Sequence, residues 1–314
     1  MSADHRLLRR STLAHAGRDD HVLRRRAREG GVVKLAPGTY VEAELWGEAD
    51  ERQRHLLRAH AVLGRLTAPV VVSHETALAF HGFPLLGRWP EQVHVVDPGR
   101  RTTLSTSRLV RHATDLPESD VVLGGGATAT SAARAALDIA RSRDLRGGAV
   151  VLDHGLRTAA FSHDEAWELL ERRRSSPGSR AAALALAFAD GKAESAGESL
   201  SRVGLVEAGL AQPVLQKEFR DASGFIGRVD FWWPCCGVVG EFDGLMKYLG
   251  RTERRGRTPE QVVVDEKVRE DRIRALPEVR GFARWLWGDA LRATPMVAAV
   301  RAAGLAGCHH ATAR

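Results

Sequence analysis

The sequence has little cysteine and no long hydrophobic run. Its 314 residues include three cysteines, too few for a disulfide framework, which favours a reducing cytoplasm. Cys235 and Cys236 also lack a paired cysteine or histidine at zinc-finger spacing. No apolar stretch approaches the length of a membrane span, and the first residues show no apolar signal segment. We therefore expect a cytoplasmic protein that has no membrane partner.

Lysine is scarce as well, whereas arginine is abundant. Lysine occurs five times among the 46 lysines and arginines, and the net charge is +7 against 39 acidic residues. The arginine fork matches the geometry of phosphate oxygens, so this composition suits nucleic-acid contact. A GC-rich genome also raises arginine throughout a protein. The charge alone therefore permits nucleic-acid binding without showing it.

Residues 1–48 predict a small basic module. A helix is expected over residues 21–28 and two short strands over 32–35 and 39–41. A basic helix followed by a two-stranded ribbon is the outline of a winged helix, in which the helix enters the major groove and the ribbon touches phosphates. The alternative is a solvated basic helix packed against a hairpin. The candidate phosphate contacts are Arg24, Arg25, Arg26, Arg28 and Lys34.

Residues 49–175 alternate predicted helices and strands, which indicates a middle α/β domain. Four histidines in it, His74, His81, His94 and His112, lie on different predicted elements and at no metal-ligand spacing. We therefore expect hydrogen-bonded structural or surface histidines there, not a metal site. Residues 176–192 read as a linker with an alanine-rich helix.

Residues 193–300 have the clearest element order, and 301–314 read as a disordered tail. A helix, three strands, a second helix and a final strand give the order αβββαβ. The fold class is therefore predicted to be mixed α/β (α+β). The predicted helices cover 193–210 and 259–276, and the strands cover 214–220, 225–233, 238–243 and 281–287.

Three carboxylates stand on the two consecutive apolar strands of this region. They are Asp230 on the first strand, and Glu241 and Asp243 on one face of the next. Buried carboxylates are costly unless they hold a cation or are otherwise paired. A cluster of them at one sheet end favours Mg²⁺ or Mn²⁺, and a metal held in this way most often serves phosphodiester chemistry.

Glu198 lies on the preceding helix, one turn after Glu194 and away from the core stripe, where it can complete the metal shell. A second interpretation needs no catalysis. Ser195 and Glu198 have the spacing of a capping box, in which each side chain satisfies a backbone group at the helix start. Both interpretations stay open at this point.

The segment from Glu194 to about Leu291 resembles the very-short-patch-repair-like endonuclease domains, which belong to the restriction-endonuclease-like PD-(D/E)xK superfamily. These domains share the αβββαβ core. The resemblance implies that Glu198 matches the helical acid of the family, Asp230 the strand acid and Glu241 the first acid of the acid-x-Lys motif.

The sequence departs from that motif at the lysine, because Asp243 stands at its position. The candidate replacements are Lys247, four residues on, and Lys267 on the next predicted helix, which could orient the attacking water. The alternative for Lys267 is a solvated helix charge paired with Asp271. A domain that binds metal but is catalytically weak also fits.

The front of the chain resembles the transcriptional-regulator-type antitoxins of type IV abortive-infection toxin–antitoxin systems. The resemblance rests on residues 18–41 and on the stretch 73–82. It implies an amino-terminal winged helix, repression of the protein's own operon and a toxin partner.

Together these features predict a DNA-binding protein with a metal-dependent endonuclease-like domain that hydrolyses phosphodiester bonds. The alternative is a non-catalytic, antitoxin-like repressor with a degenerate nuclease fold. A third possibility is a scaffold that contacts another protein through its tryptophan-rich strands, although large aromatic residues in strands usually pack inward. The tryptophans concerned are Trp232, Trp233, Trp285 and Trp287.

Overall fold

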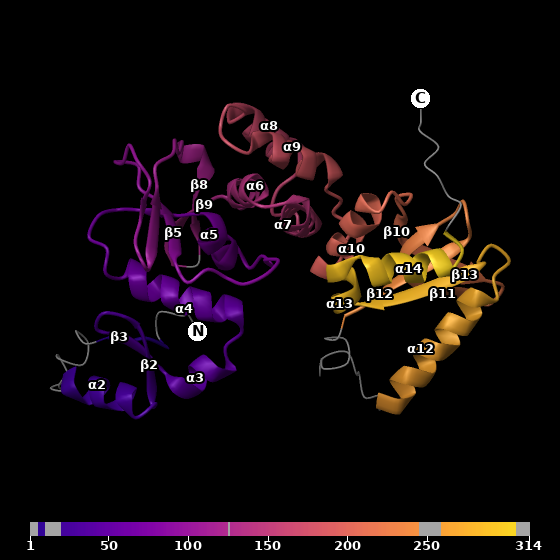
Figure 1. Cartoon of the computed structure of the whole chain (residues 1–314), viewed down its shortest axis with the longest axis horizontal. Coiled ribbons are helices and arrows are strands. Elements are labelled where there is room, and N and C mark those ends of the chain that lie inside the picture. The colour runs from indigo at the N-terminus through magenta and orange to yellow at the C-terminus, as the bar shows by residue number, and fades with distance from the viewer. Residues whose placement is uncertain (1–5, 10–19, 125, 245–258, 306–314) are drawn as a thin grey trace. The chain divides into compact units, whose positions relative to one another are not determined.

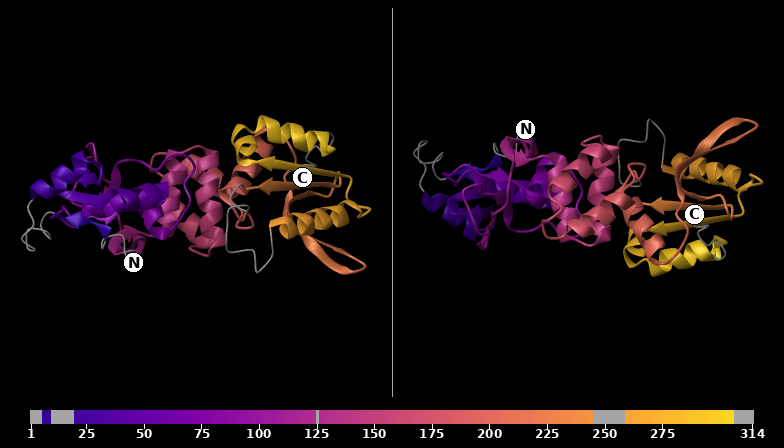
Figure 2. Two further views of the ribbon diagram at one scale, coloured as in Figure 1. Left: turned by 90° about the horizontal axis from the view of Figure 1, so that it is seen from below. Right: turned by 90° about the horizontal axis from the view of Figure 1, so that it is seen from above.

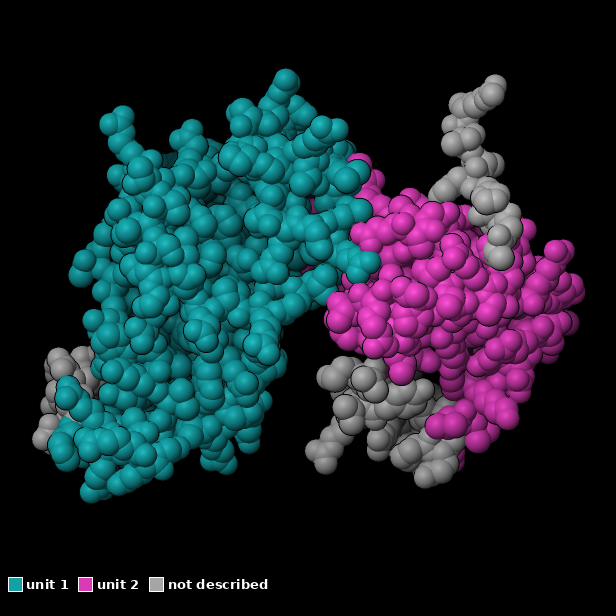
Figure 3. All heavy atoms as spheres, in the orientation of Figure 1, with its two compact units in different colours: residues 1–151, 159–186 teal, residues 152–158, 187–314 magenta. Residues whose placement is uncertain are grey.

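The computed structural model of the chain describes residues 6–9, 20–124, 126–244 and 259–305. The chain forms two compact units (Figure 3). Unit 1 contains residues 1–151 and 159–186, and unit 2 contains residues 152–158 and 187–314. Both units combine helices with sheets, so the predicted mixed α/β class is confirmed.

Unit 1 begins with a small head, in which a helix precedes a two-stranded ribbon as the sequence predicts (Figure 1). Leu23 on the helix packs against Val32 and Tyr40 on the ribbon, and this contact fixes the helix over the sheet. The three-stranded antiparallel sheet has the order β1-β3-β2. The elements are β1 (Leu8–Arg9), α2 (Asp20–Arg28), β2 (Val32–Ala36), β3 (Thr39–Glu42), α3 (Ala43–Glu48) and α4 (Glu51–Leu63).

A six-stranded mixed sheet forms the centre of the rest of unit 1, with the order β6-β7-β5-β4-β9-β8. The pairs β5/β7 and β4/β9 are parallel, and the other neighbours are antiparallel. The strands are β4 (Val71–Val72), β5 (Val93–Val96), β6 (Leu104–Ser105), β7 (Leu109–His112), β8 (Val121–Gly124) and β9 (Ala127–Thr130).

Helices pack around this sheet. Helix α5 is buried among α4, α6 and strand β5, because its small residues allow close approach, and it ends at Gly82, whose φ of 81° suits a residue without a Cβ. None of the described helices is both long and apolar enough to cross a membrane. The helices are α5 (His74–His81), the 3₁₀ turn Glu118–Asp120, α6 (Ala132–Ser142), α7 (Leu145–Arg157), α8 (His163–Arg172) and α9 (Ser179–Phe188).

Unit 2 has the predicted order of helix, three strands, helix and strand. Its sheet has the order β10-β11-β12-β13; the first three strands are antiparallel, and β13 runs parallel to β12. Helix α12 makes the crossover that a parallel pair needs. The elements are α10 (Ala196–Glu207), β10 (Val214–Asp221), β11 (Gly224–Trp233), β12 (Val238–Asp243), α12 (Pro259–Arg274), β13 (Gly281–Leu286), α13 (Trp287–Arg292) and α14 (Thr294–Ala302).

The sheet of unit 2 lies between two helical layers (Figure 2). On one face, Trp285 donates its indole N–H to Ser201 Oγ of α10, at 2.8 Å. On the other face, Ile273 of α12 packs with Val229 and Trp232. Part of the stretch predicted as a tail is ordered, since α14 runs to Ala302; residues 306–314 lie outside the described part.

The tryptophans of unit 2 are mainly core residues. The side chains of Trp232, Trp233 and Trp285 are 6%, 0% and 2% exposed, whereas Trp287 is 37% exposed. Three of the four therefore pack inward, as strand aromatic residues usually do. They offer no tryptophan-rich surface to a partner.

Candidate functional site

A basic pocket of about 730 Å³ lies on the head. Arg24 on α2, Lys34 on β2 and Arg65 just after α4 contribute cations to its lining. Arg24 and Lys34 are exposed. The helix and the ribbon thus present positive charge to one concave surface, which is the arrangement that contact with a phosphate backbone requires.

The other predicted phosphate contacts have different surroundings. Arg26 makes a bidentate pair with Glu42 of β3, at 3.1 and 2.7 Å, and so ties the helix to the ribbon. Arg25 lies 3.5 Å from Glu29, and both side chains are largely exposed. Arg28 is exposed in the last turn of the helix. Arg24 and Lys34 are therefore the two predicted contacts that line the basic pocket.

In unit 2, the helical acid Glu198 is buried beneath the start of α10. Its carboxylate accepts hydrogen bonds from Ser195 Oγ at 2.8 Å, from Glu194 N at 2.9 Å and from Gln216 Nε2 at 2.8 Å. Burial, followed by the nearby charge of Asp230, raises the pKa of Glu198 to about 7. The structure thus brings Glu198 and Asp230 together, as the sequence predicts.

Helix capping accounts for part of the environment of Glu198. Ser195 Oγ accepts from Glu198 N at 3.2 Å, as expected for a capping residue. The carboxylate, however, bonds to the backbone of Glu194 instead of Ser195, and it also takes a hydrogen bond from Gln216 on β10. The cap therefore accounts for only part of the hydrogen bonding of this carboxylate.

The sheet is irregular beside Asp230. The ladder between β10 and β11 pairs Leu215 with Phe231 and Lys217 with Val229, and it skips Gln216 and Asp230 in between. Gln216 has a φ of 54°, in the left-handed region, which is costly for a residue with a side chain. Asp230 Oδ2 accepts from Phe242 N of β12 at 2.8 Å. Backbone strain of this kind is typical of functional sites.

Glu241 and Asp243 lie among arginines. Glu241 accepts from Arg269 Nη2 at 2.5 Å and lies 2.8 Å from Arg284 Nη2, and Asp243 lies 3.7 Å from Arg284 Nη1. Burial raises the pKa of Glu241, although the two arginines oppose this shift. Among the described residues, no three of the predicted carboxylates place ligand atoms within 4.8 Å of one another.

The structure describes one of the two lysines predicted to replace the motif lysine. Lys267 is exposed on α12, and no ion pair within the described residues joins it to Asp230, Glu241 or Asp243. The cations that reach Glu241 are Arg269 and Arg284. Lys247 lies outside the described residues.

The carboxylates fit a divalent cation only in part. Mg²⁺ is usually held by one or two protein carboxylates together with waters and substrate phosphates. Glu198 and Asp230 offer two carboxylates, and burial followed by the charge of Asp230 raises the pKa of Glu198, a shift that a bound cation would oppose. Glu241 and Asp243 are already paired with arginine, so they are weaker candidates for ligands.

Sequence reasoning missed one cluster in unit 1. His74, His94 and His112 come from α5, β5 and β7, and one ring nitrogen of each lies within 4.8 Å of the others. Three of the four histidines therefore lie together, which their positions along the chain do not indicate, and the expectation of structural or surface histidines stays untested for them. His81 does behave as a structural histidine, since its Nε2 lies 2.7 Å from the carbonyl oxygen of Thr130.

A signal for this cluster was present in the strands. His94 pairs with Val110 in the parallel β5/β7 ladder, so His112, two residues further on, shares its face. His74 follows the end of β4, and its neighbour Ser73 donates its backbone N–H to the carbonyl oxygen of His94 at 3.0 Å, which places His74 beside the two strand histidines. The spacing along the chain does not reveal these pairings.

Comparisons with known proteins give relatives but no activity. No family model matches the chain. Uncharacterized proteins from two strains of Mycobacterium tuberculosis are each 29% identical to it over 233 residues, which is 72% of this chain and 79% of each relative. Their names state no function. An account of function therefore depends on the geometry of the sites.

Proposed function

We propose that this protein binds DNA through its amino-terminal head and carries a PD-(D/E)xK-type, endonuclease-like domain in unit 2. The basic pocket is the observation that carries the proposal, because Arg24 on the helix and Lys34 on the ribbon line the same concave surface. Lysine and arginine at such a surface displace the counterions of a nucleic acid, and this release supplies most of the sequence-independent affinity.

The structure of the head supports this role. The bidentate pair between Arg26 and Glu42 holds the helix against the ribbon, so Arg24 and Lys34 are presented by elements that are fixed to each other. A fixed arrangement lowers the entropic cost of binding. The three-stranded sheet behind the helix is the remaining part of the winged-helix outline.

Fluorescence anisotropy with a labelled duplex tests the proposal. The double variant Arg24→Gln/Lys34→Gln should bind about 10 to 100 times more weakly than the parent, because two phosphate contacts are lost. The matched control is Arg100→Gln/Arg101→Gln, which removes the same charge from exposed positions of unit 1 outside the head. If the two double variants lose equal affinity, the head is not the DNA-binding surface.

Metal-dependent phosphodiester hydrolysis is a second candidate function. The buried Glu198 and the half-buried Asp230 support it, since burial and then the charge of Asp230 raise the pKa of Glu198, and a bound cation would oppose this shift. Mg²⁺ or Mn²⁺ held there would act as a Lewis acid on a scissile phosphate and activate a water. Within the chain, Gln216 and Ser195 orient the Glu198 carboxylate, and Phe242 N orients that of Asp230.

Cleavage of labelled DNA with Mg²⁺ and with Mn²⁺ separates the two candidates. Hydrolysis predicts strand breaks that Asp230→Asn abolishes while DNA binding is retained. DNA that is bound but left intact supports the non-catalytic, antitoxin-like regulator, which would act on its operon with a toxin partner. The pairing of Glu241 and Asp243 with arginine, together with the exposed position of Lys267, is the observation that favours this regulator.

A further inference from the structure

Three histidines meet on one face of the large sheet of unit 1. The rings of His74 and His112 are stacked, with centroids 3.8 Å apart, and His94 Nδ1 lies 3.1 Å from His112 Nε2. Among the described histidines, cysteines and acids, this is the one group of three whose ligand atoms all lie within 4.8 Å. Imidazole nitrogen suits Zn²⁺ and other divalent transition metals.

The rings lie mostly away from solvent. The side chains of His74, His94 and His112 are all partly buried, so a metal ion bound there would be shielded from bulk water. A metal binds the lone pair of a neutral imidazole ring.

Nearby polar groups orient the rings. Ser73 Oγ lies 3.0 Å from His74 Nδ1, which leaves His74 Nε2 for a ligand. Glu75 Oε2 lies 3.6 Å from His94 Nδ1, and Arg143 holds the other Glu75 oxygen at 3.0 Å. His94 Nδ1 is also the nitrogen that faces His112 Nε2, so the Glu75 carboxylate places negative charge beside the nitrogens that would bind a metal.

The backbone adds a second sign of function. His74 has a φ of 51°, although it is not glycine and it opens α5. A residue with a side chain pays on the order of 1–3 kcal/mol for this conformation, and such strain gathers at binding sites. The strained backbone sets the direction in which His74 enters the cluster.

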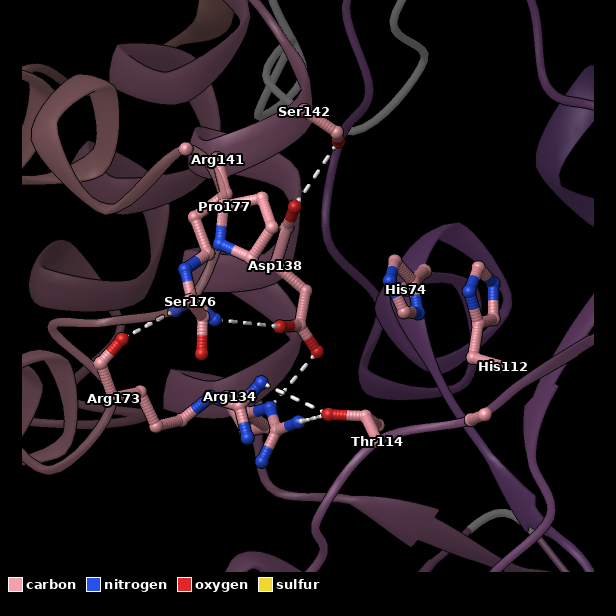
Figure 4. Close-up of a pocket in the computed structure, with 12 residues that line it drawn as sticks. His74, His112, Thr114, Arg134, Asp138, Arg141, Ser142, Arg173, Ser176 and Pro177 are labelled. Carbon is pink, nitrogen blue, oxygen red and sulfur yellow. Dashed lines mark hydrogen bonds and ion pairs between the residues drawn. The ribbon is translucent and has the colours of Figure 1, made fainter. Parts of the chain in front are cut away.

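His74 and His112 also line a pocket of about 460 Å³, and cations line its opposite wall. Figure 4 shows the two stacked rings on one side, with Arg134, Arg173 and Asp138 across from them. Arg141 belongs to the same wall. The pocket therefore joins a potential metal site to an arginine-rich surface.

The arginines of this wall are not fully satisfied. Arg141 Nε and Arg173 Nε are buried and have no hydrogen-bond partner within the described part of the chain. The whole Arg141 side chain is only 7% exposed. Burial and then the charge of Arg134 lower the pKa of Arg173 to about 10. Buried donors without partners are costly, and an anion would satisfy them.

We propose that His74, His94 and His112 bind one Zn²⁺ ion, and that its open position faces the arginine-lined pocket, where a phosphate-like anion binds. Three histidines and one exchangeable ligand form a common arrangement for reactive zinc. Tetrahedral zinc brings ligand nitrogens to about 3.3 Å from one another, so metal binding requires the stacked rings of His74 and His112 to rotate. The site is separate from the proposed DNA-binding head and from the carboxylates of unit 2.

Titration calorimetry with Zn²⁺ on tag-free full-length protein tests the metal site, and the visible absorption of Co²⁺ reports its geometry. The parent should bind one equivalent and give the intense absorption bands of tetrahedral cobalt. His112→Gln and His94→Gln should each weaken Zn²⁺ binding by about 100-fold or more, because each removes a direct ligand. His163→Gln is the control, since His163 contacts the carbonyl oxygen of Leu186 on α9 and lies outside the cluster.

Circular dichroism establishes whether each variant is folded. Two ligand variants are used so that the test still gives an answer if one of them does not fold. The metal site is refuted if the parent takes up no Zn²⁺, or if a folded His112→Gln or His94→Gln protein binds as tightly as the parent. A parent that binds Zn²⁺ without the absorption of tetrahedral cobalt also contradicts the proposed geometry.

Inorganic phosphate tests the second half of the proposal. Phosphate should bind the Zn²⁺-loaded parent, and Arg141→Gln should weaken that binding by about tenfold while leaving Zn²⁺ affinity unchanged. Arg108→Gln, at an exposed residue outside the pocket, is the matched control. Absence of phosphate binding, or equal binding by the parent and Arg141→Gln, overturns the anion site.

Discussion

The two units balance their clustered charges in opposite ways. In unit 2, Arg284 lies within 4 Å of four carboxylates, of which only Glu241 is buried, and Arg269 and Arg274 pair with some of the same acids. The four carboxylates are those of Glu241, Asp243, Glu266 and Glu270. In unit 1, two buried aspartates are shared among four arginines. Asp120 and Asp138 are 2% and 5% exposed, and the surrounding cations are Arg134, Arg141, Arg172 and Arg173.

The sign of the excess charge indicates the sign of the missing ligand. At Glu198, burial and then the charge of Asp230 raise the pKa, and a bound cation would oppose this shift. At Arg173, burial and then the charge of Arg134 lower the pKa, and a bound anion would oppose this shift. The comparison therefore predicts a metal ion in unit 2 and an anion next to the histidines of unit 1.

The largest expected effect comes from removing the central arginine of unit 1. Arg134 is 1% exposed and binds both Asp120 and Asp138 at 2.9 Å. Arg134→Met would leave two buried carboxylates short of a partner and should lower the free energy of unfolding by about 3–5 kcal/mol. Chemical denaturation measures this loss. A change below about 1 kcal/mol would show that the aspartates do not depend on Arg134.

A smaller effect is expected at Glu198, and it depends on pH. Burial, and then Asp230, raises the pKa of this carboxyl from 4.5 to about 7, so the folded protein holds the proton more tightly than the unfolded chain does. The resulting stabilisation is complete below pH 4.5 and is lost as the pH rises through about 7. Between those limits the parent should lose about 2–3 kcal/mol relative to Glu198→Gln.

Denaturation of both proteins at a series of pH values measures this difference, and Mg²⁺ sharpens the test. A cation bound by Glu198 and Asp230 favours the ionised carboxylates, so Mg²⁺ should reduce the pH-dependent loss in the parent but not in Glu198→Gln. Parallel curves for the two proteins at every pH would contradict the raised pKa.

The smallest stability effect is expected at the exposed pair of the head. The side chains of Arg26 and Glu42 are 39% and 43% exposed, so solvent screens their attraction. Arg26→Gln should lower the free energy of unfolding by about 1 kcal/mol or less, as measured by thermal unfolding. A loss as large as that of Arg134→Met would remove the distinction between buried and exposed arginines on which the comparison depends.

Much of the fold follows from the sequence pattern, because local signals decide the elements. Apolar periodicity and turn residues predict α2, the ribbon and the αβββαβ order of unit 2, all of which are observed. The proximity of Glu198 and Asp230 agrees with the family resemblance of this segment and not with neighbouring positions, because β10 separates α10 from β11 along the chain.

Non-local pairing limits the rest of the prediction. His94 and His112 meet because β5 and β7 form a parallel pair, although β6 lies between them along the chain. The residues of the two strands do not indicate this register. The pairing of Glu241 with Arg269 and Arg284 likewise depends on where α12 and β13 are placed on the sheet. Spacing along one strand puts Glu241 and Asp243 on one face but does not identify the arginines opposite them.

The salt dependence of DNA binding tests the central claim most directly. The logarithm of the association constant should fall linearly with the logarithm of the salt concentration, with a slope of about −0.9 for each phosphate contact. Arg24→Gln/Lys34→Gln should make this slope less steep by about 2, while Arg100→Gln/Arg101→Gln leaves it unchanged. An unchanged slope in the head variant, or no salt dependence in the parent, would contradict DNA binding through the head.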